Sequence, residues 1–236
     1  MNIEVLADAG AVAQRGAALI VEDARRAAAV RGRCFIALSG GRTPWAMLRL
    51  LAEEDVPWKK VHLFQVDERV APAGDPDRNL AHLRASLLDR IPLPPEQMHA
   101  MPVDSPDLVA AAARYAHDLE ATAGLPPVLD LVHLGLGADG HTASLVPGDP
   151  VLEVTNEDVA LTRAYFGGIR MTLTYRILAR ARRILWLVSG AEKAAMLARL
   201  LSGDRSIPAG RVCTGNALIL ADRTAATGHQ ASSMFA

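Results

Sequence analysis

The stretch Cys34-Phe35-Ile36-Ala37-Leu38-Ser39-Gly40-Gly41 decides the fold class. Its first five residues are all apolar and a Ser-Gly-Gly turn ends them at once, which is typical of a short strand buried on both faces of a parallel sheet. A helix is expected directly afterwards, because Thr43 can cap it and Pro44 suits a first helical position. The stretch therefore predicts a strand, a tight turn and a helix, the repeating unit of an α/β protein.

The same order of strand and helix recurs along the chain. Before the stretch, Asp8 to Arg31 show apolar side chains at helical spacing. The further expected strands are residues 61–66, 129–134, 184–188 and 217–220, and the further expected helices are residues 79–90, 108–122 and 191–201. Alternating strands and helices imply right-handed crossovers. The sequence thus predicts an α/β fold with a mainly parallel, Rossmann-like central sheet and helices on both faces.

Length and composition favour one domain that acts on a small molecule. The chain has 236 residues, 50% of them hydrophobic, which is enough for one sizeable core, so a single domain is expected over residues 1–236. Lys and Arg number 25 against 26 Asp and Glu, so no strong field attracts nucleic acid or an acidic membrane. The sequence leaves the oligomeric state open, with a monomer slightly favoured.

Targeting, membrane and disulfide signals are all missing from the sequence. The chain does not start with a basic segment followed by an apolar run. No stretch approaches the roughly 18 uncharged apolar residues of a membrane span. Cys34 and Cys213 are the two cysteines, and they suit a reducing compartment better than a disulfide framework. These features predict a cytoplasmic protein.

Small and polar residues follow the first buried strand, at a place where an anion could bind. They are Ser39, Gly40, Gly41, Arg42 and Thr43, directly before the expected helix. Backbone N–H groups at a helix N-terminus lack helical partners, and the helix dipole favours negative charge there. Paired glycines also let a ligand approach the backbone closely. Two interpretations stay open: a phosphate-binding loop, or a tight turn with an ordinary helix cap.

Charged residues follow two other expected strands. Asp67-Glu68-Arg69 ends one, and the glycine-rich segment Gly135 to Ser144 after another contains Asp139 and His141. Ligands bind α/β sheets at the carboxyl ends of strands. Three consecutive charges cannot point the same way, so one or two could enter a site while another makes a structural ion pair; a solvated strand end stays open. His141 is a candidate general base, whose ring a neighbouring carboxylate can orient.

The glycine-rich segment formally contains G-x-G-x-x-G, but a dinucleotide site is not expected. That fingerprint opens a long helix, whereas Pro147, Gly148 and Pro150 stop any helix soon afterwards. The chain also lacks G-x-S-x-G, H-E-x-x-H and paired C-x-x-C motifs. Since no set of histidines has metal-ligand spacing, we expect no metal site. His133, inside its expected strand, is interpreted as a core histidine or as one that contacts the site residues from behind.

Two cations further along the chain complete the candidate site. They are Arg170 and Lys193. Lys193 falls in the first turn of its expected helix, where a cation opposes the helix dipole, and a bound phosphate would remove that conflict. The alternative for each side chain is a head group that extends into solvent.

Taken together, these segments resemble the 6-phosphogluconolactonase family. The resemblance rests on Ser39 to Pro44, Val66 to Arg69, Asp130 to Ser144, Arg170 to Thr174 and Gly190 to Ala194. Glucosamine-6-phosphate deaminases share several of these elements, but their Asp-Gly-His turn continues toward a catalytic Glu, whereas this chain continues Thr142-Ala143-Ser144-Leu145-Val146-Pro147. Arg42 and Gly167 depart from the family pattern, which often has a small residue and a Pro at these positions.

The resemblance implies a deaminase-like α/β fold and hydrolysis of 6-phosphoglucono-lactone in the oxidative pentose phosphate pathway, with no cofactor. It implies that His141 activates water, and that Asp67 and Asp139 orient His141 and the sugar. It implies that Arg69 stabilises the oxyanion, with binding of substrate hydroxyls or of an acidic neighbour as the alternatives. The residues that would hold the phosphate are Ser39, Gly40, Gly41, Arg42, Thr43, Arg170 and Lys193. A glucosamine-6-phosphate deaminase or isomerase and a non-catalytic sugar-phosphate sensor are the alternatives.

Overall fold

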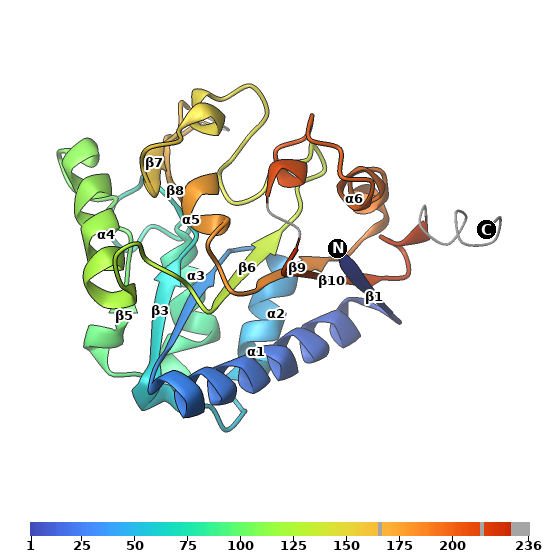
Figure 1. Ribbon diagram of the computed structural model, residues 1–236, viewed down its shortest axis with the longest axis horizontal. Helices are drawn as coiled ribbons and strands as arrows, with labels where there is room; N and C mark the ends of the chain where they lie inside the picture. Colours follow the sequence, from blue (N-terminus) through green and yellow to red (C-terminus); the bar gives the residue numbers. More distant parts are fainter. Residues whose placement is uncertain (165–166, 213–214, 228–236) are drawn as a thin grey trace.

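A seven-stranded, entirely parallel sheet forms the centre of the protein (Figure 1). The computed structural model describes residues 1–164, 167–212 and 215–227, so Cys213 lies outside the described residues. In spatial order the strands are β1 (Asn2–Leu6), β10 (Ala217–Asp222), β9 (Ile184–Val188), β6 (Leu131–Gly135), β2 (Cys34–Leu38), β3 (Val61–Gln65) and β5 (Met98–His99). The predicted parallel α/β architecture is confirmed.

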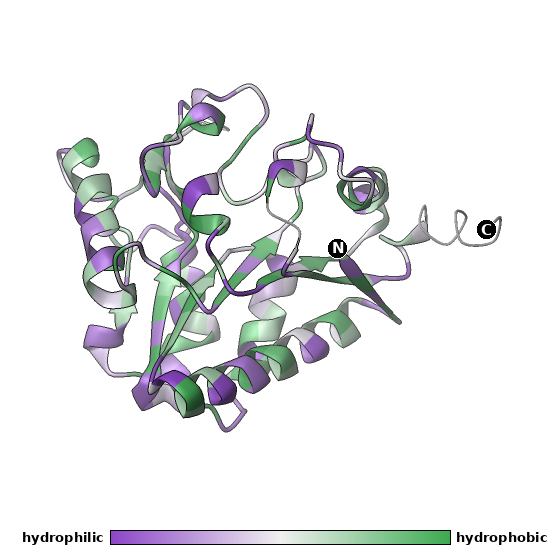
Figure 2. Cartoon of the chain, in the orientation of Figure 1, coloured by the Kyte–Doolittle hydropathy of each residue, from purple (hydrophilic) through white to green (hydrophobic). Residues whose placement is uncertain are grey.

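Helices cover both faces of this sheet. They are α1 (Ala9–Arg31), α2 (Arg42–Leu51), α3 (Asn79–Ser86), α4 (Leu108–Ala123), α5 (Tyr175–Leu178) and α6 (Ala194–Leu201). Ile36 and Leu38 of β2 pack with α1, α2 and α3, while Ala37 belongs to the second core, with α4, α5 and α6. Side chains alternate across a strand, so a wholly apolar run serves two cores at once. Figure 2 accordingly shows mostly hydrophobic strands between helices of mixed character.

A second, antiparallel sheet was not predicted. It joins β4 (Asp67–Arg69), β8 (Arg170–Leu173) and β7 (Val159–Leu161). Strands of three or four residues are too short to show a periodic pattern, and the two-residue β5 was missed for the same reason. The register pairs Arg69 with Arg170. Two charged residues separated by about a hundred positions are thus brought to adjacent strands.

The helix after the glycine turn begins earlier than predicted. Gly41 is the N-cap residue and α2 starts at Arg42, with no side-chain cap, so the prediction that Thr43 caps and Pro44 opens this helix is wrong. Gly41 has a φ of 129°, a conformation that favours glycine, and it turns the chain into the helix before Thr43 is reached. Pro44 is tolerated because the first helical N–H groups have no intrahelical acceptor.

Two other helix boundaries differ slightly from expectation. The helix predicted for residues 79–90 ends at Ser86 and is followed by the 3-10 turn Leu88–Arg90. The helix predicted for residues 191–201 opens with the 3-10 turn Ala191–Lys193 before α6. Tighter 3-10 turns are common at helix ends.

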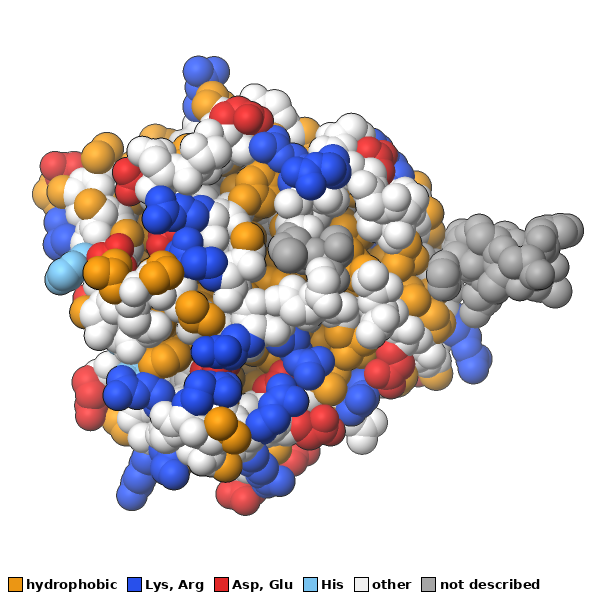
Figure 3. All heavy atoms as spheres, in the orientation of Figure 1, with side chains coloured by type: hydrophobic (Ala, Val, Ile, Leu, Met, Phe, Trp, Pro, Cys, Tyr) orange, Lys and Arg blue, Asp and Glu red, His pale blue; other side chains and the backbone are white. Residues whose placement is uncertain are grey.

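Charge on the surface is mixed. On the face shown in Figure 3, Lys and Arg side chains gather over α1, with Asp and Glu side chains among them. Within the described parts of the chain, no helix is both long and apolar enough to span a bilayer. Cys34 is a buried free cysteine, and burial raises the pKa of its thiol, so it behaves as a packing residue.

Truncating the core side of α2 should destabilise the fold. Leu48 is fully buried, whereas Leu50 on the same helix is 42% exposed. We expect Leu48→Ala to lower the free energy of unfolding by about 2–5 kcal/mol, because a cavity remains beneath the helix. The matched Leu50→Ala variant should change it by less than about 0.5 kcal/mol. Urea denaturation measures both values, and equal losses would contradict the assigned burial.

Candidate active site

A cleft of about 310 Å³ opens where the parallel strands end. It is lined by the turn after β2, by the segments after β3 and β6, and by the end of β9 with the residues that follow it, which are Leu187, Val188, Ser189, Glu192 and Lys193. Carboxyl ends of parallel strands meet at one edge of the sheet, which is where α/β proteins bind ligands. All the predicted site residues line this cleft except Asp139, which contacts His141 directly.

Hydrogen bonds join the turn after β2 to the neighbouring strand β6. Ser39 donates its hydroxyl to the carbonyl oxygen of His133 at 2.9 Å, and its backbone N–H points to His133 Nδ1 at 3.3 Å. His133 is fully buried, and burial lowers its pKa to about 3. The ring is therefore neutral near neutral pH, and the prediction of a core histidine is confirmed.

Glycines in this turn allow close approach of other parts of the site. A Cβ atom at Gly40 would collide with the side chain of Asn79. Gly41 leads into α2, whose first N–H groups carry no side-chain cap. Arg42 and Thr43, the first two residues of α2, line the cleft. The turn therefore presents uncapped helix N–H groups and a cation toward the cleft, as an anion-binding loop would.

His141 and Asp139 form a hydrogen-bonded pair. His141 Nδ1 lies 2.6 Å from Asp139 Oδ1, which also accepts the backbone N–H of His141 at 3.1 Å. Their side chains are 33% and 40% exposed. A Cβ atom at Gly137 would collide with both side chains, so this glycine makes room for the pair. With the Nδ1 proton directed at a carboxylate, Nε2 carries the lone pair and can act as a base.

Asp67 is buried beside the same turn. Its Oδ2 accepts a hydrogen bond from Ser144 Oγ at 2.6 Å, and burial raises the pKa of its carboxyl. Ala143, between His141 and Ser144, has a φ of 51°, a left-handed conformation that is unusual for a residue other than glycine. The hydrogen bonds of the Asp67 carboxylate go to Ser144 and Asn79, so Asp139 is the acid that contacts the His141 ring.

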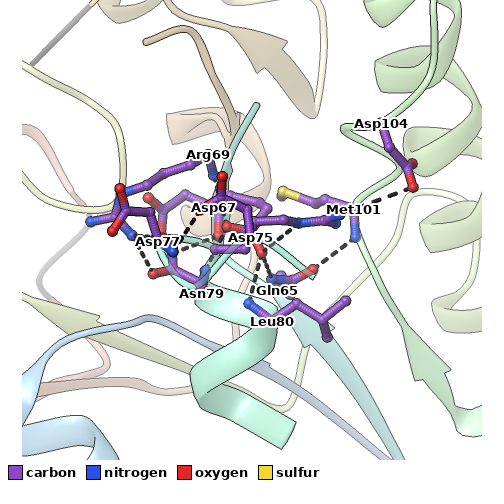
Figure 4. Close-up of polar contacts among 11 residues, drawn as sticks. Gln65, Asp67, Arg69, Asp75, Asp77, Asn79, Leu80, Met101 and Asp104 are labelled. Carbon is purple, nitrogen blue, oxygen red and sulfur yellow. Dashed lines mark hydrogen bonds and ion pairs between the residues drawn. The ribbon is translucent and has the colours of Figure 1, made fainter. Parts of the chain in front are cut away.

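Glu68 points away from the cleft, as the alternation of side chains along a strand requires. Its fully buried carboxylate accepts the backbone N–H groups of Arg69, Asn79 and Leu80 at 2.7–2.8 Å and the side-chain amide of Gln65 at 2.8 Å (Figure 4). An ion pair with buried Arg78 at 3.8 Å adds a countercharge. As expected, Asp67 and Arg69 line the cleft, while Glu68 makes a structural ion pair.

Arg69 reaches the cleft between two neutral oxygen atoms. Its Nη1 donates to the backbone carbonyl of Asp77 at 2.8 Å and to Asn79 Oδ1 at 2.9 Å (Figure 4). Asn79 Nδ2 in turn donates to the carbonyl oxygen of Asp67 at 3.0 Å. The sequence pattern predicts no function for Asn79 or Ser144 on its own. An Asn at the start of a helix is too common to indicate a site by itself. The contact of Ser144 with Asp67 joins residues far apart in the sequence, so no local pattern predicts it.

Cations predominate around the cleft. The ones that line it are Arg42, Arg69, Arg170 and Lys193, while the carboxylates that line it are Asp67 and Glu192. Arg170 lies on β8 opposite Arg69, and Lys193 immediately precedes α6. Among the described residues, no group of three or more His, Cys, Asp or Glu side chains could hold a metal ion. The charge distribution suits an anionic ligand.

Comparison with known proteins identifies the family. Residues 7–220 match the model of "Glucosamine-6-phosphate isomerases/6-phosphogluconolactonase". The chain is 38% identical to a 6-phosphogluconolactonase of Mycobacterium tuberculosis, covering 95% of this chain and 97% of that protein. It is 35% identical to one of Synechocystis sp., covering 86% of each.

Solved structures agree with this match. The 6-phosphogluconolactonase of Thermotoga maritima superposes with a TM-score of 0.83 at 28% identity, covering 94% of this chain and 98% of that one. A monomeric glucosamine-6-phosphate deaminase has a TM-score of 0.85 at 19% identity, covering 97% of this chain and 100% of that one, a likeness of fold alone. The chain belongs to the glucosamine-6-phosphate isomerase/6-phosphogluconolactonase family.

Proposed function

We propose that the chain hydrolyses 6-phospho-D-glucono-1,5-lactone to 6-phospho-D-gluconate, a step of the oxidative pentose phosphate pathway. Its curated relatives at 35–38% identity carry the name 6-phosphogluconolactonase. The observation that carries the proposal is the His141–Asp139 pair in a cleft lined by Arg42, Arg69, Arg170 and Lys193. A candidate base and a candidate phosphate-binding site thus line the same cleft. A sensor would need only the phosphate-binding site.

The chemistry follows from the ester bond of the lactone. His141 Nε2 takes a proton from a water molecule, whose oxygen attacks the C1 carbonyl and forms a tetrahedral oxyanion. Asp139 accepts the Nδ1 hydrogen bond and stabilises the imidazolium that results. When the intermediate collapses, the bond from C1 to the ring oxygen breaks and the imidazolium returns the proton to that oxygen. The product is the open-chain acid, which ionises.

Positive groups stabilise the two negatively charged groups of the reacting molecule, the oxyanion and the phosphate. Arg69, held by Asp77 and Asn79, is placed to stabilise the oxyanion. The phosphate is held by the turn Ser39 to Thr43 together with Arg170 and Lys193, through uncapped N–H groups and charge-assisted hydrogen bonds. Asp67, anchored to Ser144, is placed to contact the sugar.

The alternative deaminase or isomerase activity is less well supported by the site. After the Asp-Gly-His turn the chain places Thr142, Ala143 and Ser144, and Ser144 is occupied in holding Asp67. No acid follows His141 within this turn. We further propose one domain over residues 1–236 that works in the cytoplasm, without a cofactor or a nucleic-acid partner. The family match over residues 7–220 supports a single unit.

Replacing His141 tests the general base. We expect His141→Asn to lower kcat by about 10²- to 10⁴-fold with a smaller effect on KM, the usual contribution of a positioned base. A proton-release assay with freshly generated 6-phosphoglucono-lactone measures both constants. His117→Asn, on the exposed surface of α4, is the matched control and should behave as wild type. Normal turnover by folded His141→Asn would remove the residue from this role.

Metal removal should leave the activity unchanged. An activated water and a cationic oxyanion stabiliser are sufficient for a lactone, so the proposed steps involve no Lewis acid. We expect the same kcat before and after dialysis against a strong chelator. Activity that is lost on dialysis and restored by zinc or magnesium would contradict the proposed mechanism.

Replacing the phosphate-binding cations should discriminate between two lactones. We expect Arg170→Ala and Lys193→Ala each to lower kcat/KM for the phosphorylated lactone by about 10- to 150-fold, since a hydrogen bond to a charged group contributes roughly 1.5–3 kcal/mol. Turnover of glucono-lactone, which lacks the phosphate, should be poor and nearly unaffected. Lys60→Ala, on the exposed surface, is the control. Equal losses on both lactones would refute the phosphate assignment.

A further inference from the structure

The guanidinium of Arg69 is held by neutral oxygen atoms, although acidic residues surround it. Its Nη1 donates to a backbone carbonyl, of Asp77, and to the side-chain amide of Asn79. Asp67 and Glu68 immediately precede Arg69, yet in the part of the chain that the structure describes no carboxylate lies within 4.0 Å of its guanidinium nitrogens. The position of Arg69 is therefore fixed without a carboxylate in direct contact with its guanidinium.

The two neighbouring carboxylates are engaged elsewhere. Glu68 is fully buried and accepts hydrogen bonds from three backbone N–H groups and from Gln65 (Figure 4). One of these N–H groups belongs to Arg69, so Glu68 fixes the backbone of this residue and leaves its guanidinium to other partners. Asp67 directs its carboxylate at Ser144 Oγ, 2.6 Å away.

Asn79 can take only one orientation in this network. Arginine has donors only, so the atom of Asn79 that faces Arg69 must be the oxygen. The carbonyl of Asp67 is an acceptor only, so the atom that faces it must be the amide nitrogen. Asn79 as a residue is 8% exposed, and Gly40 leaves the space that its side chain fills. Both ends of the amide are therefore committed, and the amide is held rigidly.

We propose that Asn79 is a positioning residue that aims Arg69 at the cleft through a neutral oxygen, so that the guanidinium charge remains available to the oxyanion. The inference rests on the proposed function. A carboxylate in the same place would hold Arg69 equally well, but its negative charge would offset the positive charge of the guanidinium. Such pairing would weaken the electrostatic stabilisation of the oxyanion at the reacting carbonyl. Asparagine supplies the geometry without the countercharge.

A purely structural role for Asn79 makes a different prediction. Asn79 is the first residue of α3, where the helix dipole favours a carboxylate, but Glu68 and the Asp67 carbonyl already crowd this end of the helix. If crowding alone excludes an acid, Asn79→Asp would lower the melting temperature and leave kcat of the folded enzyme intact. If the neutral amide of Asn79 keeps the charge of Arg69 available to the oxyanion, Asn79→Asp lowers kcat while KM and the melting temperature change little.

The first measurement compares two variants at pH 7.5. We expect Asn79→Asp, which has the same shape, to lower kcat by about 10²-fold, the scale for loss of one oxyanion donor. We expect Asn79→Ala to lower kcat by about 10-fold, because the charge survives and Asp77 still accepts a bond. KM should change by less than about threefold in both. An equal or smaller loss in Asn79→Asp would overturn the inference, since shape alone predicts that order.

The second measurement follows the ratio of kcat in Asn79→Asp to kcat in wild type as the pH falls. A protonated carboxyl is neutral, can accept from Arg69 and can donate to the Asp67 carbonyl, as the amide does. The ratio should therefore rise toward one at acidic pH, and any pH dependence that the two enzymes share cancels in the ratio. A ratio that stays constant with pH would overturn the inference. Asn156→Asp, which adds the same charge at an exposed position, should show a ratio of one throughout.

Two controls separate the possible failures. If the wild type does not hydrolyse the lactone, the proposed function is wrong, whereas an active wild type with Asn79→Asp at full kcat leaves the function intact and overturns this inference alone. If Asn79→Asp does not fold, by circular dichroism, Asn79→Ala decides: a fall in kcat of about fivefold or more at unchanged KM supports the positioning role. A smaller fall in kcat in folded Asn79→Ala overturns it.

Discussion

A buried carboxylate needs hydrogen-bond donors, and three segments of the chain supply them to Glu68. It accepts from Gln65 at the end of β3, from the backbone of β4, and from the first two N–H groups of α3. Leaving such a charge unpaired in the interior would cost several kcal/mol. The chain between β4 and α3 is therefore held in the one path that satisfies Glu68, and that path places Arg69 and Asn79 at the cleft.

The second constraint is the direction of the strands. Because all seven strands of the large sheet are parallel, the turns after β2, β6 and β9 open on the same edge. The small antiparallel sheet adds Arg170 from β8 opposite Arg69 of β4. Residues from Ser39 to Lys193 meet in one cleft in this way. The large sheet supplies the loop and the base, and the small sheet supplies two of the cations.

The sequence predicted best what depends on long apolar runs. The strands at residues 34–38 and 184–188 agree with the structure at both ends, because both are buried on two faces. Strands of two to four residues carry no such pattern. The prediction that Thr43 caps α2 was wrong because Gly41 ends the turn and the helix begins before Thr43. Charged residues that follow buried strands were recognisable as a site, whereas the Ser144–Asp67 contact joins residues 77 positions apart and has no local signal.

Two histidines near the end of β6 show how burial divides chemical roles. His133 is enclosed, its pKa falls to about 3, and the ring stays neutral through the physiological range. The unfolded chain takes up a proton near the ordinary pKa of about 6.5, so burial of His133 costs stability increasingly as the pH falls from there toward 3. His141 is one-third exposed and has Asp139 on Nδ1. Of the two rings, His141 is therefore the one that lines the cleft with a carboxylate in place on Nδ1, whereas His133 is enclosed.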